Sequence, residues 1–169
     1  PGGAGRAVNV ARFPEMLQAL DAAGVQFIVV GGLAATIHGS PRLTQDLDIV
    51  YSRTAENLER LVRALRPFHP YLRGAPPGLP FLFDARTLKS GLNFTFVTDL
   101  GWMDLLGEIT GGGDYDRLLP HSTDLQMFGV SIKVLNLEKL IEVKRAAGRP
   151  KDFETIAELE AIREELKGR

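Results

Sequence analysis

Two aspartates lie one residue apart in a run that otherwise reads as a β-strand, the segment QDLDIVY that contains Asp46 and Asp48. Aspartate is a poor strand former, and alternate residues of a strand share one face, so these carboxylates repel each other. Their side chains start roughly 6.6 Å apart at the usual rise of a strand. Carboxylates at this separation can converge on a divalent cation, with oxygens about 2.1 Å from Mg²⁺, and the cation removes the repulsion. The pair therefore predicts a cation site.

A third acidic residue, Asp104, lies in a second strand-like run, GWMDLLGE. It shares a face with Trp102 and Leu106, where a charge without a partner is unfavourable. A neighbouring strand of the same sheet lies about 4.8 Å away, so Asp104 can join the other two aspartates. Three carboxylates on adjacent strands can hold two cations for phosphoryl transfer. The ordinary alternative is that all three are solvated residues at a strand edge or in a turn.

Gly31 and Gly32 separate a short apolar run, VQFIVV, from a short helical run, LAATIHG. Backbone N–H groups at the start of a helix can bind phosphate, and glycine permits close approach. The simpler alternative is a tight turn. No lysine followed by serine or threonine stands at the spacing of a P-loop, and the G-x-G-x-x-G spacing is absent, so these two common nucleotide-binding motifs are excluded.

Basic residues gather near the C-terminal end, where Lys133 to Lys151 contain six Lys or Arg and two acids in a chain of net charge −1. Lys144 projects from the apolar stripe of a predicted helix, so it needs an anionic partner or must extend to solvent. A triphosphate or one of the aspartates would serve as that partner. Arg149 and Lys151 follow the end of this helix. They can contact a nucleotide or RNA, or form an ion pair with Asp152.

Arg42 and Thr44 share the face of the aspartates if the strand begins early enough to include them. Arg42 can then hold a phosphate, or neutralise the acids when no metal is bound. His38 is expected to pack in the core rather than bind a metal.

The surrounding patterns alternate helix and strand, and a Pro- and Gly-rich stretch at residues 68–92 is predicted to be mostly irregular. Helices are expected at 14–23, 33–39, 54–67, 137–148 and 151–166, and strands at 25–30, 43–52, 92–99, 101–109 and 130–136. This order predicts an α+β (α/β-like) fold with a mixed, twisted sheet of about 4–5 strands, helices on one side and a C-terminal helical pair.

Composition limits the remaining choices. The chain has 169 residues, 44% hydrophobic and 24% charged, which suits one domain with a core of its own. It has no cysteine, which excludes disulfides and thiolate metal sites and fits a reducing compartment. No apolar run reaches the length of a membrane span. We expect a cytoplasmic protein that does not bind membranes.

These motifs together resemble a known family. Two glycines, thirteen residues, the run Asp-Leu-Asp on a strand and a later strand aspartate are similar to the DNA polymerase β-like nucleotidyltransferase superfamily. The run GGLAATIHGSPRLTQDLDI, with a later K-x4-R-x-K-D run, more narrowly resembles small bacterial nucleotidyltransferases of the abortive-infection (type IV toxin–antitoxin) kind. On this resemblance residues 13–169 form one nucleotidyltransferase domain, with a core at about 25–135 and C-terminal helices at 136–167. Residues 1–12 are expected to be disordered or processed.

The family implies a palm-like sheet, two Mg²⁺ (or Mn²⁺) ions, and transfer of an NMP from an NTP such as ATP to an acceptor hydroxyl. Asp46, Asp48 and Asp104 would ligate the metal and catalyse the reaction, with Asp104 nearest the attacking hydroxyl. Gly31 and Gly32 would hold the β- and γ-phosphates.

The remaining phosphate- or nucleotide-binding candidates are Arg42, Thr44, Lys144, Arg149 and Lys151.

The acceptor and the biological role stay open at this stage. A tRNA end, a protein or a small molecule can supply the hydroxyl, and a toxin-like role would imply a cognate antitoxin or a partner subunit. One alternative is a non-catalytic relative that binds a nucleotide, RNA or a partner protein, and it is favoured by Leu33, which stands where the family's phosphate loop has serine. Another is a metal-dependent hydrolase that uses the same acids.

Overall fold

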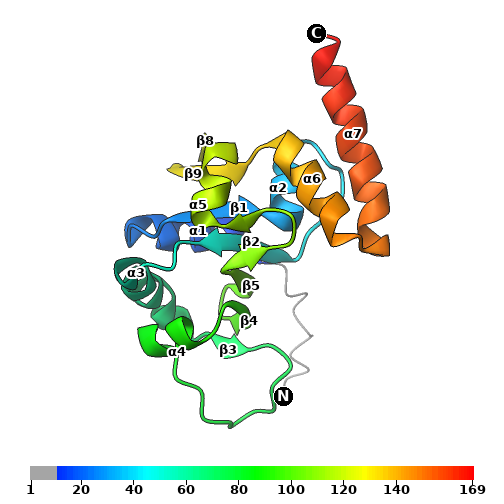
Figure 1. The fold of residues 1–169 in the computed structure, drawn as a ribbon. Helices are drawn as coiled ribbons and strands as arrows, with labels where there is room; N and C mark the ends of the chain where they lie inside the picture. Colours follow the sequence, from blue (N-terminus) through cyan, green and yellow to red (C-terminus); the bar gives the residue numbers. More distant parts are fainter. Residues whose placement is uncertain (1–10) are drawn as a thin grey trace, which may run out of the picture.

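The computed structural model describes residues 11–169 (Figure 1), so the predicted character of residues 1–10 lies outside the described part. Its helices are α1 (Phe13–Ala22), α2 (Gly31–Ile37), α3 (Ala55–Leu65), α4 (Ala85–Ser90), α5 (Tyr115–Leu118), α6 (Leu137–Ala147) and α7 (Phe153–Lys167). Its strands are β1 (Phe27–Val30), β2 (Asp46–Tyr51), β3 (Tyr71–Leu72), β4 (Asn93–Thr98), β5 (Gly101–Leu106), β6 (Glu108–Ile109), β7 (Gly113–Asp114), β8 (Ser122–Met127) and β9 (Val130–Leu135). None of the helices in this range combines the length and hydropathy needed to cross a bilayer.

One mixed sheet forms the centre of the molecule, with the strand order β3-β4-β5-β2-β1-β9-β8. β1 runs antiparallel to β2 and parallel to β9, and β2 runs parallel to β5. β6 and β7 form a separate small hairpin. The predicted α+β class with a mixed sheet and a C-terminal helix pair is confirmed. The main sheet has seven strands rather than the expected four or five, because the two-residue β3 and the polar β8, which have no apolar pattern, form its edges.

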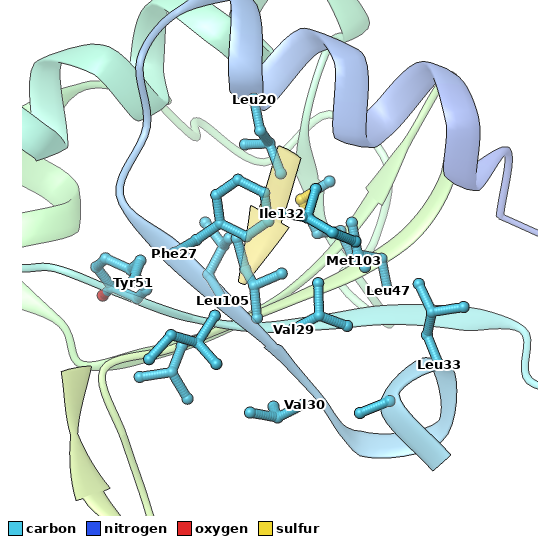
Figure 2. Packing of buried hydrophobic residues seen from close by; sticks show 14 of the residues in the cluster. Leu20, Phe27, Val29, Val30, Leu33, Leu47, Tyr51, Met103, Leu105 and Ile132 are labelled. Atoms are coloured by element: carbon cyan, nitrogen blue, oxygen red, sulfur yellow. The ribbon is translucent and has the colours of Figure 1, made fainter. Parts of the chain in front are cut away.

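The two faces of the sheet differ in character. Alternate residues of β1, β2 and β5 face a dry core that α1 and α3 complete, and Figure 2 shows Leu20 of α1 lying above Phe27, Val29 and Met103 of the sheet. The other face carries Asp48 and Asp104, and the C-terminal pair α6 and α7, which pack side by side, lies at its edge (Figure 1). The polar face is therefore held in place by a core behind it.

Local signals explain the helix boundaries near the site. The Thr54 side chain accepts a hydrogen bond from the Asn57 backbone N–H at the start of α3, as its position before the helical run predicts. Asn136 caps α6 in the same way by accepting from the Lys139 N–H. Gly148 ends α6 in the left-handed conformation, with φ of 62°. Asn136 and Gly148 set the two ends of α6, and Lys144 therefore lies in its last turn.

The sequence-based boundaries need three corrections. β2 begins at Asp46 rather than at Leu43, because residues 41–45 form no ladder with β1 or β5. α2 begins at Gly31, so both glycines lie inside the helix rather than before it. β8 was not expected, because its sequence STDLQM is polar and only one of its edges is paired in the described sheet.

The stretch 68–92 is more ordered than its Pro and Gly content predicts. It contains β3 and α4, and β3 pairs antiparallel with β4 at the edge of the sheet. Phe81 and Phe83 pack on the buried ring of Phe96, with ring centroids 5.8 and 5.5 Å from it. This segment closes the core. Arg73, the residue that follows β3, lies on the polar face, and its backbone N–H donates to the Thr95 carbonyl oxygen.

Candidate active site

Three half-buried carboxylates converge on the polar face of the sheet. β2 and β5 are adjacent parallel strands, and their register places Asp48 directly opposite Asp104, while Asp46 lies two residues before Asp48 on the same face. One oxygen each of Asp46, Asp48 and Asp104 lies within 4.8 Å of the other two. This arrangement offers three hard oxygen ligands to one region of space, as a divalent cation requires.

The electrostatics of this carboxylate cluster also favour a cation. Asp48 Oδ1 is buried and has no hydrogen-bond partner among the residues that the structure describes. Burial, followed by the charges of Asp104 and Asp46, raises the pKa of Asp48 to about 7. Burial also raises the pKa of Asp46, although the nearby Arg73 opposes this effect. An ion among these carboxylates would satisfy the orphaned oxygen and remove the repulsion, so the residues fit a Mg²⁺ or Mn²⁺ ion.

Gly31 and Gly32 allow α2 to approach the carboxylates closely. Gly31 has φ of 65°, and a Cβ on it would overlap the Asp48 carboxylate. A Cβ on Gly32 would lie 2.5 Å from Thr44 Oγ1. The paired glycines are thus required by the packing of the first turn of α2 against β2 and the preceding loop, whatever ligand binds there.

Two clefts meet at the carboxylate cluster and share Gly31, Asp48, Asp104, Lys144 and Arg149. The first, the basic cleft, has a volume of about 330 Å³, and all ten residues predicted from the sequence as catalytic or phosphate-binding line it. The second, the apolar cleft, has a volume of about 380 Å³. Its own lining residues are mostly aliphatic: Val30, Leu106, Ile109, Leu140, Val143 and Ala147, with Asn93, Glu108 and Thr110.

The cations of the basic cleft are held in different ways. Lys144 is buried, with its ammonium 3.6 Å from the Asp152 carboxylate, and Asp48 lies close enough for the lysine charge to lower its pKa. Arg149 Nε donates to Asp152 at 2.7 Å, which is the ion pair foreseen as the alternative to nucleotide contact. Lys151 is exposed and has no ion pair within the described residues. Lys144 and Lys151 therefore keep most of their donors free for an anion.

Arg42 lies farther from the acids than its expected strand position implies. It precedes β2 in a loop, and its guanidinium pairs with Glu154 and, at 2.9 Å, with Glu158, both on α7. These two carboxylates raise the pKa of Arg42. Its side chain still lines the basic cleft, but it does not neutralise the aspartates. His38 packs as expected, with Nε2 2.7 Å from the Leu135 carbonyl oxygen.

Comparison with solved structures identifies the architecture around this site. The lincosamide antibiotic adenylyltransferase LnuA, in its lincomycin-bound crystal structure, matches with a TM-score of 0.60 over 91% of this chain and 99% of its own, at 14% identity. The chain therefore shares the fold of this adenylyltransferase. An antigenic nucleotidyltransferase-like protein from Paracoccidioides brasiliensis matches with a TM-score of 0.55 over 90% of this chain and 77% of its own, at 17% identity. No family model matches the chain, and no curated protein matches its sequence.

One residue at the carboxylate cluster was missed by the sequence analysis. Arg73 Nη2 donates to Asp104 Oδ1 at 2.8 Å, and Nη1 lies 3.5 Å from Asp46 Oδ2. Arg73 stands in the Pro- and Gly-rich stretch, where no hydrophobic period marks its position. Only the pairing of β3 with β4 brings it to the site, and that pairing has no local sequence signal.

Proposed function

We propose that the chain is a Mg²⁺-dependent nucleotidyltransferase that moves an NMP from an NTP to an acceptor hydroxyl. The observation that carries the proposal is the convergence of Asp46, Asp48 and Asp104 at the place where the basic cleft meets the apolar cleft. A divalent cation bound there would polarise the α-phosphate and lower the pKa of the acceptor hydroxyl. The orphaned Asp48 Oδ1 supports the carboxylates as its ligands.

The basic cleft suits the triphosphate. In this proposal the first turn of α2 faces the β- and γ-phosphates, and Lys144 and Lys151 offset their charge. Leu33 cannot supply the hydroxyl that the family's motif provides, because its side chain is apolar and buried in the core. Thr44 lines the same cleft, and its hydroxyl lies against Gly32 and donates to the Asp46 carbonyl oxygen at 3.3 Å. The cleft thus retains a hydroxyl although the motif has lost its serine.

The apolar cleft suits the acceptor. The acceptor oxygen would form a bond to the α-phosphorus while the bond from that phosphorus to the bridging oxygen breaks. Pyrophosphate would leave through the basic cleft, and the hydroxyl proton would pass to Asp104.

A cleft of about 380 Å³, lined by aliphatic side chains together with a few polar and charged groups, fits a small molecule, whereas RNA recognition usually relies on basic grooves and stacking aromatic rings. LnuA, which shares the fold, is described with the small molecule lincomycin bound. We therefore propose a small-molecule hydroxyl as the acceptor. Transfer to RNA or protein, a toxin role and a cognate antitoxin follow from the sequence resemblance alone and stay predictions.

The test offers each of the four NTPs, labelled at the α-phosphate, together with Mg²⁺ and three acceptor pools: small-molecule extract, total RNA and total protein. We expect label in the small-molecule pool with the wild-type chain, and none with Asp104→Asn. The matched control is Asp124→Asn on β8, an exposed carboxylate in a 2.8 Å ion pair with Lys133, which should transfer label normally.

Three other outcomes would contradict different parts of the proposal. Label in the RNA or protein pool would keep the transferase and overturn the small-molecule acceptor. Binding of Mg²⁺–NTP by calorimetry without transfer to any pool would favour a non-catalytic nucleotide-binding protein. Absence of Mg²⁺–NTP binding would overturn the phosphate-binding role of Gly31 and Gly32.

A further inference from the structure

A positive charge belonging to the protein itself already lies inside the carboxylate cluster. The guanidinium of Arg73 bridges Asp104 and Asp46, at 2.8 and 3.5 Å from one oxygen of each. It does not contact Asp48 within hydrogen-bond distance, and Asp48 Oδ1 keeps its orphaned, buried position. The cluster is therefore asymmetric, with one side neutralised by an arginine and the other side open.

Arg73 is anchored by groups that are not metal ligands. Its Nη2 also donates to the Phe96 carbonyl oxygen at 3.1 Å, and its guanidinium stacks over the Trp102 ring at 4.6 Å from the centroid. Its side chain is only 22% exposed, and its backbone N–H is bonded to the neighbouring strand β4. An arginine held by a carbonyl, an aromatic face and a strand ladder keeps its place when an ion enters beside it.

We propose that Arg73 acts as a built-in cation of the cluster: it occupies the position between Asp46 and Asp104, so that the nucleotide-free protein binds one divalent ion, on the side of Asp48. The inference rests on the proposed function insofar as the cluster holds a divalent ion. When all three carboxylates are ionised, the guanidinium of Arg73 and the nearby ammonium of Lys144 leave a net charge of about −1 before any ion binds. One divalent ion then more than neutralises the negative charge of the cluster. A second divalent ion therefore binds only together with the triphosphate, whose negative charge offsets it.

Arg73 also makes the two carboxylate oxygens of Asp104 different from each other. Asp104 Oδ1 accepts the hydrogen bond from Arg73, so one of its lone pairs is occupied and Oδ2 has the greater capacity to face Asp48, the ion or a substrate hydroxyl. Arg73 is thus a positioning residue, and its removal should change metal binding itself, which can be measured without any turnover.

The experiment titrates the nucleotide-free protein with Mn²⁺ and counts bound ions by electron paramagnetic resonance, with calorimetry for affinity. We expect one Mn²⁺ per wild-type chain. Arg73→Gln should bind its first Mn²⁺ at least about tenfold more tightly, because a charge in contact with two of the ligands is removed, and it should admit a second ion. Arg73→Lys keeps the positive charge but loses the two-nitrogen guanidinium group, and it should bind the same number of Mn²⁺ ions per chain as the wild type.

Arg53→Gln is the matched control. Arg53 also stacks on an aromatic ring, that of Tyr51, and also donates to carbonyl oxygens, but it lies on the other face of the sheet. Two Mn²⁺ per wild-type chain, or an Arg73→Gln affinity equal to or below that of the wild type in a protein that unfolds at a normal temperature, would overturn the inference and leave the proposed function intact. No Mn²⁺ binding by either protein would overturn both.

Discussion

Replacing Asp48 by asparagine should stabilise the metal-free protein, and the gain should grow with pH. Asp48 has its pKa raised from 3.8 to about 7, first by burial and then by Asp104 and Asp46. Each pKa unit corresponds to about 1.4 kcal/mol, so an ionised Asp48 lowers the free energy of unfolding by up to about 4 kcal/mol. Asparagine keeps the side-chain volume and carries no charge.

The direction of the pH dependence follows from which state binds the proton. Between pH 3.8 and about 7 the folded protein holds a proton on Asp48 that the unfolded chain has already released. The free energy of unfolding of the wild type therefore falls as pH rises through this window. The asparagine variant lacks this loss of stability, so its advantage in the free energy of unfolding should increase by roughly 2.6 kcal/mol between about pH 5 and pH 8.

Urea unfolding in the presence of a chelator, at both pH values, measures this difference directly. Asp124→Asn serves as control, because its carboxylate is 65% exposed and should give no pH-dependent gain. The reasoning is refuted if Asp48→Asn stabilises equally at both pH values, or destabilises the protein at the higher one. Addition of Mg²⁺ should stabilise the wild type and not the variant, since a ligand of the folded state alone raises the free energy of unfolding.

Three further outcomes are expected. Gly31→Ala should lower the free energy of unfolding by more than Gly24→Ala, since both positions have positive φ but only the first Cβ would overlap the Asp48 carboxylate, and thermal melts of the two variants measure that overlap. Asn57→Ala should lower the free energy of unfolding by about 2–4 kcal/mol in urea unfolding, because it removes three hydrogen bonds between the buried Asn57 amide and the backbone of Gln26 and Ser52. Mn²⁺ affinity by calorimetry should fall about tenfold per pH unit below pH 7, because Asp48 must release its proton to bind the ion, and a flat profile would contradict the assignment of Asp48 as a ligand.

The parts of this fold that the sequence predicts are those with a local cause. The apolar spacing of α3 and its Thr54 cap give that helix to within about two residues at either end. The alternation in NFTFVT and GWMDLL gives the β4–β5 hairpin. The same alternation places Asp46 with Asp48 on one face, and Asp104 with Trp102, without knowledge of the sheet order.

What the sequence does not reveal depends on pairing between distant segments. The register that sets Asp48 opposite Asp104 comes from β2 and β5, which have about fifty residues between them. β3 is two residues long and has no period, yet it places Arg73 at the site. Arg42 looked like the natural partner of the acids because it is near them in the chain, but α7, far along the sequence, supplies its partners. Chain proximity therefore predicted the Arg149–Asp152 pair correctly and failed for Arg42, whose partners come from a distant helix.

The strand order has a consequence for how the chain is made. β1 and β2 pair with each other and are synthesised early, but one edge of this pair waits for β5 and the other waits for β9, which ends at Leu135. A nascent chain on the ribosome thus carries two unfilled strand edges until β5 ends at Leu106, and one until β9 is made, and such edges invite association with other chains. Charged side chains on an unpaired edge oppose that association. Before they can bind any ion, Asp46 and Asp48 are therefore expected to protect the unfinished sheet.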